Sequence, residues 1–187
     1  MFDDRDMKIA GDKPSRTIGR NSQPDSLSPD ELAMQRELLD RAGLLGAALA
    51  GTVCDMQEEF ELVGEDMSDA IVQRRLLRCF AVPFALDKYA VNALISRTAL
   101  NAFYNTLKRL DVAFYDDLNN NGAFSFYFLA GRSTGDAVRR IGQTFAMLCS
   151  HDGDPVFQEL GETLFCRYVA LVRAQIDEYR LLRDENK

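Results

Sequence analysis

Oxygen-bearing side chains at alternate positions are the first candidates for chemistry in this 187-residue sequence. Asp117, Asn119 and Asn121 are spaced two residues apart and are followed by Gly122, a residue that permits a tight turn of the backbone. Carboxylate and amide oxygens are the ligands that a hard cation such as Ca²⁺ prefers. The chemistry that these residues could perform is therefore metal binding.

Residues 117–125 resemble the first nine positions of the twelve-residue calcium loop of EF-hand proteins. At the last position an EF-hand has a glutamate that binds calcium through both oxygens, whereas this chain has Phe128. Asp117 is then the single ligand with a formal charge, so we predict no metal site and no cofactor. We interpret the segment from Asn119 to Gly122 as a turn that ends a helix, with its residues in the left-handed conformation.

A serine between two glycines is the second candidate. Residues 131–135, Gly-Arg-Ser-Thr-Gly, resemble the nucleophile elbow of α/β-hydrolases, in which a general base activates the serine. His151 is the chain's single histidine, and no alternation of strands and helices predicts the parallel sheet that this fold needs. We therefore expect no catalytic residue, and we interpret Ser133 as the N-cap of a helix with Asp136 as its capping-box partner.

The same segment is also a candidate anion site. Arg132 and Ser133 stand at an expected helix start, where backbone N–H groups attract a phosphate or a carboxylate. We interpret the remaining arginine clusters of the chain as solvated helix faces; they comprise Arg74, Arg75 and Arg78, and Arg139 and Arg140.

Residues 90–104 resemble a helix-turn-helix, in which Ser96-Arg97-Thr98 would open the recognition helix. Leu94 stands where such a motif usually has glycine, and the apolar heptad pattern continues through the proposed turn. A formal net charge of −7 also repels phosphate backbones. We therefore predict a continuous helix and disfavour nucleic acid as a partner.

Aromatic side chains are concentrated between residues 103 and 128. Because aromatic side chains have large apolar areas, we expect this segment to anchor the core. They could also enclose a small apolar ligand. The candidate pocket residues are Tyr89, Phe103, Tyr104, Phe114, Phe124 and Phe128.

Composition is that of one folded domain, with 47% hydrophobic and 27% charged residues. Four cysteines lie far apart without a zinc or redox spacing, so we predict buried, reduced thiols and a cytoplasmic protein. The longest apolar run, Ala42 to Cys54, is too short to cross a bilayer, so we expect no membrane association.

Apolar spacing and capping residues predict an all-α bundle of five or six helices over residues 28–187, preceded by a flexible arm at 1–27. Ser28 and Pro29 predict the start of a first helix that runs to about Gly64. Small residues within it, such as Gly46 and Ala50, predict a close crossing with another helix.

Pro83 predicts a break or a kink in the helix, and the heptads after it predict one long central helix that continues to the turn near Asn119. Residues 124–130 fit either a strand or a helix, and we favour a helix. Asp154 and Pro155 predict the start of the last helix, which carries two apolar stripes.

Two functions remain open. The two-striped last helix and the small residues of the first helix favour a non-enzymatic protein that acts by association, above all as a homodimer. The alternative is a helical regulator that binds a small apolar ligand in the aromatic pocket, with or without DNA contact through residues 90–104.

Overall fold

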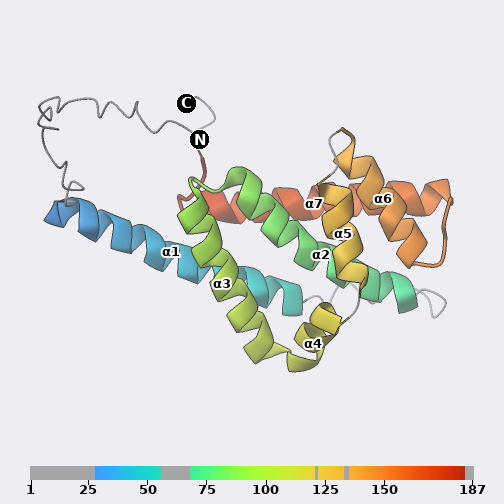
Figure 1. Ribbon diagram of the computed structural model, residues 1–187, viewed down its shortest axis with the longest axis horizontal. Helices are drawn as coiled ribbons and strands as arrows, with labels where there is room; N and C mark the ends of the chain where they lie inside the picture. Colours follow the sequence, from blue (N-terminus) through green and yellow to red (C-terminus); the bar gives the residue numbers. More distant parts are fainter. Residues whose placement is uncertain (1–27, 56–67, 121, 133–134, 184–187) are drawn as a thin grey trace, which may run out of the picture.

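The computed structural model describes residues 28–55, 68–120, 122–132 and 135–183, and these residues fold into α-helices without a strand (Figure 1). The predicted arm at 1–27 lies outside them. The seven helices of the described residues are α1 (Pro29–Cys54), α2 (Ser68–Tyr89), α3 (Ala93–Leu110), α4 (Val112–Asn120), α5 (Ala123–Gly131), α6 (Ala137–Leu148) and α7 (Pro155–Glu178). The all-α prediction is confirmed, with more helices than the five or six expected.

The start of α1 follows the prediction. The side chain of Ser28 accepts the N–H of Glu31, and the Glu31 carboxylate accepts the N–H of Ser28 at 2.8 Å. This exchange lowers the pKa of Glu31. The helix ends at Cys54, with Asp55 as its C-cap residue and the Asp55 N–H bonded to the carbonyl of Gly51; Gly64, near which we expected the end, lies outside the described residues.

The close crossing predicted for α1 is formed with α3, which lies across it (Figure 1). A Cβ atom on Gly46 would collide with the carbonyl oxygen of Ala99 and would lie 2.8 Å from both the Cβ of Ala102 and the N of Phe103. The absence of a side chain at Gly46 therefore sets the distance between the two helices.

The long central helix is not formed, and of the break or kink predicted at Pro83 the break is wrong, since the helix continues through this residue. Pro83 lies inside α2, which continues to Tyr89. The helical structure is interrupted later, at residues 90–92 and at Asp111. Polar side chains cause both breaks: Asn92 accepts the N–H of Ile95 at 2.9 Å, and Asp111 accepts that of Phe114 at 3.0 Å.

The remaining helix starts were predicted in part. Asp154 caps α7 and Pro155 opens it, as expected, and residues 123–131 form a helix rather than a strand. Gly122 has a right-handed φ of −60°, so the expected left-handed conformation is absent there. The cap of α6 is Asp136, which accepts the N–H of Arg139, whereas we expected Ser133.

The turn between α2 and α3 is hydrogen-bonded to a segment that follows α7. Val91 donates its N–H to the carbonyl of Leu181 at 2.9 Å, and Arg183 donates to that of Tyr89 at 2.8 Å. Ala90 and Leu182 thereby form an isolated antiparallel bridge. Two backbone hydrogen bonds thus hold the turn between α2 and α3 against the segment that follows α7.

Phe80 is the centre of the aromatic core. Its ring is 2% exposed and lies within 6.4 Å, centroid to centroid, of five other rings. These rings belong to Phe84, Phe124, Tyr127, Phe128 and Phe165. The side chain of Phe80 therefore joins α2 to both α5 and α7.

All four cysteines are free, but they are not all buried. Cys79 and Cys149 are buried, Cys54 is half-buried and Cys166 is exposed on α7. Burial raises the pKa of the Cys79 thiol well above its usual range. The prediction of four buried thiols is thus wrong for Cys166, because that residue lies outside the packed stripe of α7.

Candidate functional site

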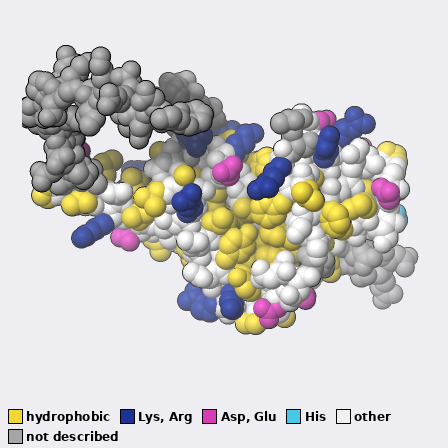
Figure 2. Space-filling view, viewed as in Figure 1, with side chains coloured by type: hydrophobic (Ala, Val, Ile, Leu, Met, Phe, Trp, Pro, Cys, Tyr) yellow, Lys and Arg dark blue, Asp and Glu magenta, His cyan; other side chains and the backbone are white. Residues whose placement is uncertain are grey.

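A groove with a cavity volume of about 630 Å³ lies between α2, α3 and α5. Figure 2 shows hydrophobic side chains gathered in the middle of this face, with Lys and Arg side chains around them. The apolar residues of the groove are Phe80, Pro83, Phe84, Leu100 and Phe128. Its size suits a small organic ligand, since such sites occupy about 300–1,000 Å³.

Helical spacing places the lining residues on one side of each helix. From α2 come residues 80, 83, 84, 87 and 88, the spacing of a single helix face. From α5 come Phe128 and Gly131, and its C-cap residue Arg132 adds a third, so that the two later residues lie three and four positions after Phe128. Glycine at position 131 leaves room for the Phe80 ring, because a Cβ there would lie 2.8 Å from the Cζ of Phe80 and the ring would have to shift.

The charged residues of the groove are mostly basic. Lys88, Arg97 and Arg132 line it together with a single acid, Asp87, although the whole chain has a net charge of −7. Neither Arg97 nor Arg132 forms an ion pair within the part of the chain that the structure describes. Both guanidinium groups are therefore available to an anion from solution.

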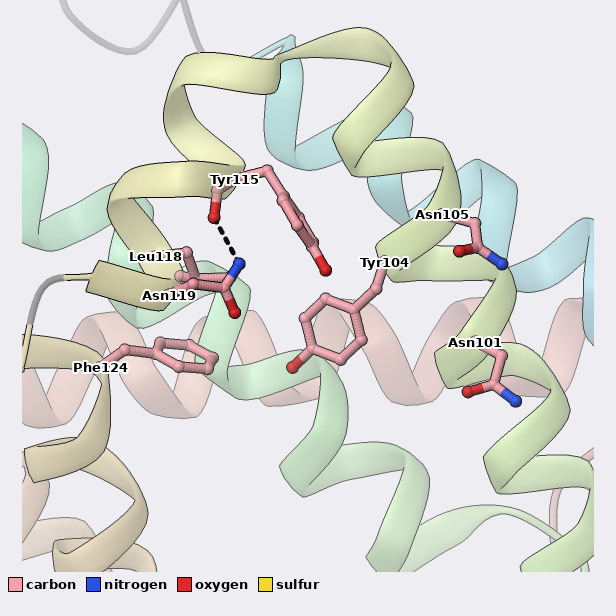
Figure 3. Close-up of a pocket in the computed structure, with 7 residues that line it drawn as sticks. All are labelled: Asn101, Tyr104, Asn105, Tyr115, Leu118, Asn119 and Phe124. Atoms are coloured by element: carbon pink, nitrogen blue, oxygen red, sulfur yellow. Dashed lines mark hydrogen bonds between the residues drawn. The ribbon is translucent and has the colours of Figure 1, made fainter.

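A second hollow, of about 330 Å³, lies between α3, α4 and the start of α5 (Figure 3). The rings of Tyr104, Tyr115 and Phe124 surround it, and Asn119 donates a side-chain N–H to the carbonyl of Tyr115 at 2.7 Å. Burial raises the pKa of Tyr104 far above its usual range, so its hydroxyl stays protonated. The other residues that line this hollow are Asn101, Asn105 and Leu118. With no charged side chain in its lining, it offers a ligand hydrogen bonds and apolar contacts but no ion pair.

The six aromatic residues predicted to form a pocket do not line one cavity. Tyr104 and Phe124 line the hollow of Figure 3, and Phe128 lines the groove. Tyr89 lines a third hollow, between α2 and α7. Phe103 and Phe114 belong to the buried core. In addition, the Arg75 guanidinium lies over the Phe114 ring, 3.8 Å from its centroid.

Sequence reasoning missed Phe80 and Phe84, which form much of the groove. Their signal was present in the spacing of residues 80, 83, 84, 87 and 88. It was overlooked because Pro83 was interpreted as a break, and a broken helix has no continuous face. Phe80, Pro83 and Phe84 lie in one uninterrupted helix.

The candidate metal and nucleophile segments are partly described. Asp117 and Asn119 are exposed residues of α4, so the start of the proposed calcium loop is helical, and Asn121 lies outside the described residues. No group of three or more His, Cys, Asp or Glu side chains in the described ranges could hold a metal ion. The ring of His151 stacks on that of Phe157, with centroids 3.7 Å apart.

The anion and DNA candidates meet at the groove. Arg132 lines it, while Ser133 lies outside the described residues. Within residues 90–104 the turn comes before Leu94 rather than at it, since α3 already begins at Ala93. Arg97, in the first turns of α3, and Arg132, the C-cap residue of α5, line the same groove. The segment is therefore not the continuous helix that we expected.

The features that favoured self-association pack within the chain. Gly46 of α1 contacts α3. The buried stripe of α7 packs on α2 and α6, where a Cβ on Gly161 would lie 2.6 Å from that of Phe145. Both features therefore make contacts within the chain.

Comparisons with protein-family models, with curated proteins and with solved structures gave no match. Within the described ranges, the helices are all too short or too polar to cross a membrane. The functional argument therefore rests on the geometry of the groove.

Proposed function

We propose that this helical protein binds an amphipathic anion in the groove between α2, α3 and α5. The apolar part of the ligand lies on Phe80, Phe84 and Leu100, and its carboxylate or phosphate lies between Arg97 and Arg132. The observation that carries this proposal is a pair of arginines that have no carboxylate partner among the described residues and that lie beside an aromatic floor.

Both parts of the groove contribute to affinity. Removing apolar surface from water contributes roughly 25 cal/mol per Å², which favours a hydrocarbon or aromatic body over a small polar ion. Guanidinium groups donate hydrogen bonds in a fixed planar fork that matches carboxylate and phosphate oxygens. A ligand with both parts therefore gains more than a neutral lipid or an inorganic anion.

The test is displacement of the fluorescent sulfonate ANS by decanoate and by decanol. We expect decanoate to displace the probe at a concentration about tenfold or more below that of decanol, the ratio that corresponds to about 1.4 kcal/mol. In the double variant Arg97→Gln, Arg132→Gln this preference should disappear. Arg109→Gln, an exposed arginine of α3 outside the groove, is the matched control and should keep it.

Equal displacement by decanoate and decanol in the parent protein would contradict the proposal. Loss of the preference in Arg109→Gln would contradict it as well, because it would show a diffuse effect of charge. For the place of action we propose the cytoplasm, supported by four free cysteines.

A further inference from the structure

Helix α5 has more apolar surface than its own chain covers. Its sequence, AFSFYFLAG, has one polar side chain, that of Ser125, and apolar residues on several sides. Ala123, Tyr127 and Ala130 face the core, and Phe128 lines the groove. On the remaining side Phe126 is 47% exposed and Leu129 is 67% exposed.

The exposed side of α5 continues onto α6 and is slightly hollowed. Phe126 and Leu129 line a depression of about 500 Å³ together with Met147 of α6, which is 40% exposed. In Figure 2, hydrophobic side chains continue from the middle of the molecule toward α6. We call this surface, formed by Phe126, Leu129 and Met147, the α5–α6 face.

Two opposite charges flank the α5–α6 face along α6. Arg140 and Asp152 both line the depression. Arg140 lies in the first half of α6, whereas Asp152 follows the end of that helix at Leu148. Eight residues of helix span about 12 Å, so the positive and negative side chains stand at opposite ends of the apolar strip.

This arrangement of charges is complementary to itself. When two identical faces meet about a two-fold axis, every contact occurs twice: if one residue of the first copy contacts a different residue of the second, the reverse contact forms as well. If the two α6 helices lie antiparallel, Arg140 of each copy meets Asp152 of the other, and the apolar residues meet in the middle. A partner protein whose contacting surface carries charges of one sign would attract one of these two side chains and repel the other.

We propose that the α5–α6 face is the interface of a two-fold symmetric homodimer of this chain, with Arg140 of each copy paired to Asp152 of the other. The proposal is independent of the ligand in the groove. Phe128, which lines the groove, lies about 200° around the helix from Phe126, counted at 100° per residue. Arg97 and Arg132 take no part in the interface.

The first test is the mass in solution as a function of concentration, by analytical ultracentrifugation. We expect the parent protein to be a dimer at about 100 μM, and Leu129→Glu to be a monomer there. Leu129 is exposed, so this change should leave the melting temperature of the monomer unchanged. The matched control is Val156→Glu, at a residue of α7 that is 70% exposed and lies outside the face; it should remain a dimer.

Charge reversal tests the pairing itself. Arg140→Asp and Asp152→Arg should each raise the dimer Kd by about tenfold or more, because each places like charges together. The double variant should return to within about threefold of the parent. A parent that is monomeric at 100 μM, a dimer that survives Leu129→Glu, or a double variant as weak as the single ones would each overturn the proposal. Displacement of ANS by decanoate should be the same in Leu129→Glu as in the parent, which separates this test from that of the groove.

Discussion

Replacing Gly46 by alanine should destabilise the protein, although alanine is the better helix former. In an open helix position the change stabilises by about 1 kcal/mol. At Gly46 the new Cβ would collide with the carbonyl oxygen of Ala99 and approach the N of Phe103 to 2.8 Å. Both are backbone atoms of α3, so the strain cannot be relieved by rotating a side chain.

The magnitude follows from two opposing effects. Overpacking costs about 1–3 kcal/mol, and more where backbone must move. With the propensity gain subtracted and the contact at the severe end, we expect a net loss of about 1–2 kcal/mol. For a chain of this size, that lowers the melting temperature by roughly 2–8 °C.

Two other glycines of α1 provide matched controls. A Cβ on Gly43 or on Gly51 would meet nothing within 4 Å. Gly43→Ala and Gly51→Ala should therefore raise the free energy of unfolding by up to about 1 kcal/mol. The assay is urea unfolding followed by circular dichroism at 222 nm. If Gly46→Ala were as stable as Gly43→Ala, the close crossing of α1 and α3 would be refuted.

Three further outcomes are expected. Asp111→Ala should cost about 1–2 kcal/mol at pH 7, because Asp111 caps the N–H of Phe114 and pairs with Arg75 at 2.8 Å. The Phe114 N–H and the Arg75 guanidinium lower the pKa of Asp111 in the folded protein. Its contribution is therefore present above the unfolded pKa of about 4 and is lost as the pH falls through the folded value, so parent and variant should converge in urea unfolding at low pH. Phe80→Ala should cost about 3–5 kcal/mol in the same assay and abolish ANS binding, since Phe80 joins three helices and forms the groove floor; a cost below about 1 kcal/mol would place it outside the core. In the native protein a thiol reagent should modify Cys166 rapidly and Cys79 only after unfolding; fast modification of Cys79 would contradict its burial.

Local signals in the sequence predicted helix starts better than helix lengths. Ser28 and Asp154 were identified because a cap, a proline and an apolar pattern agreed at one place. Asn92 and Asp111 were missed because their capping side chains interrupt an apolar repeat that itself continues. An apolar repeat indicates which side of a helix is buried, but it does not indicate where one helix ends and the next begins in a new direction.

The candidate site depended on contacts between distant segments. Arg132 was predicted as an anion-binding residue from its local surroundings, and it does line the groove. Its approach to Arg97 of α3 follows from the way α5 returns onto α2, and Phe80 governs that packing. The sequence of either segment alone does not predict that the two arginines line one groove, because the distance between two helices depends on the side-chain volumes of both helices.

The hydrogen bonds between the α2–α3 turn and the segment after α7 have a consequence for the order of folding during translation. Val91 and Tyr89 reach their hydrogen-bond partners only when Leu181 and Arg183 have left the ribosome. Until then, α2 and α3 can form, but the turn between them lacks these two hydrogen bonds, and residues on both sides of this turn line the groove. A nascent chain is therefore expected to acquire its helices early and its ability to retain a ligand late.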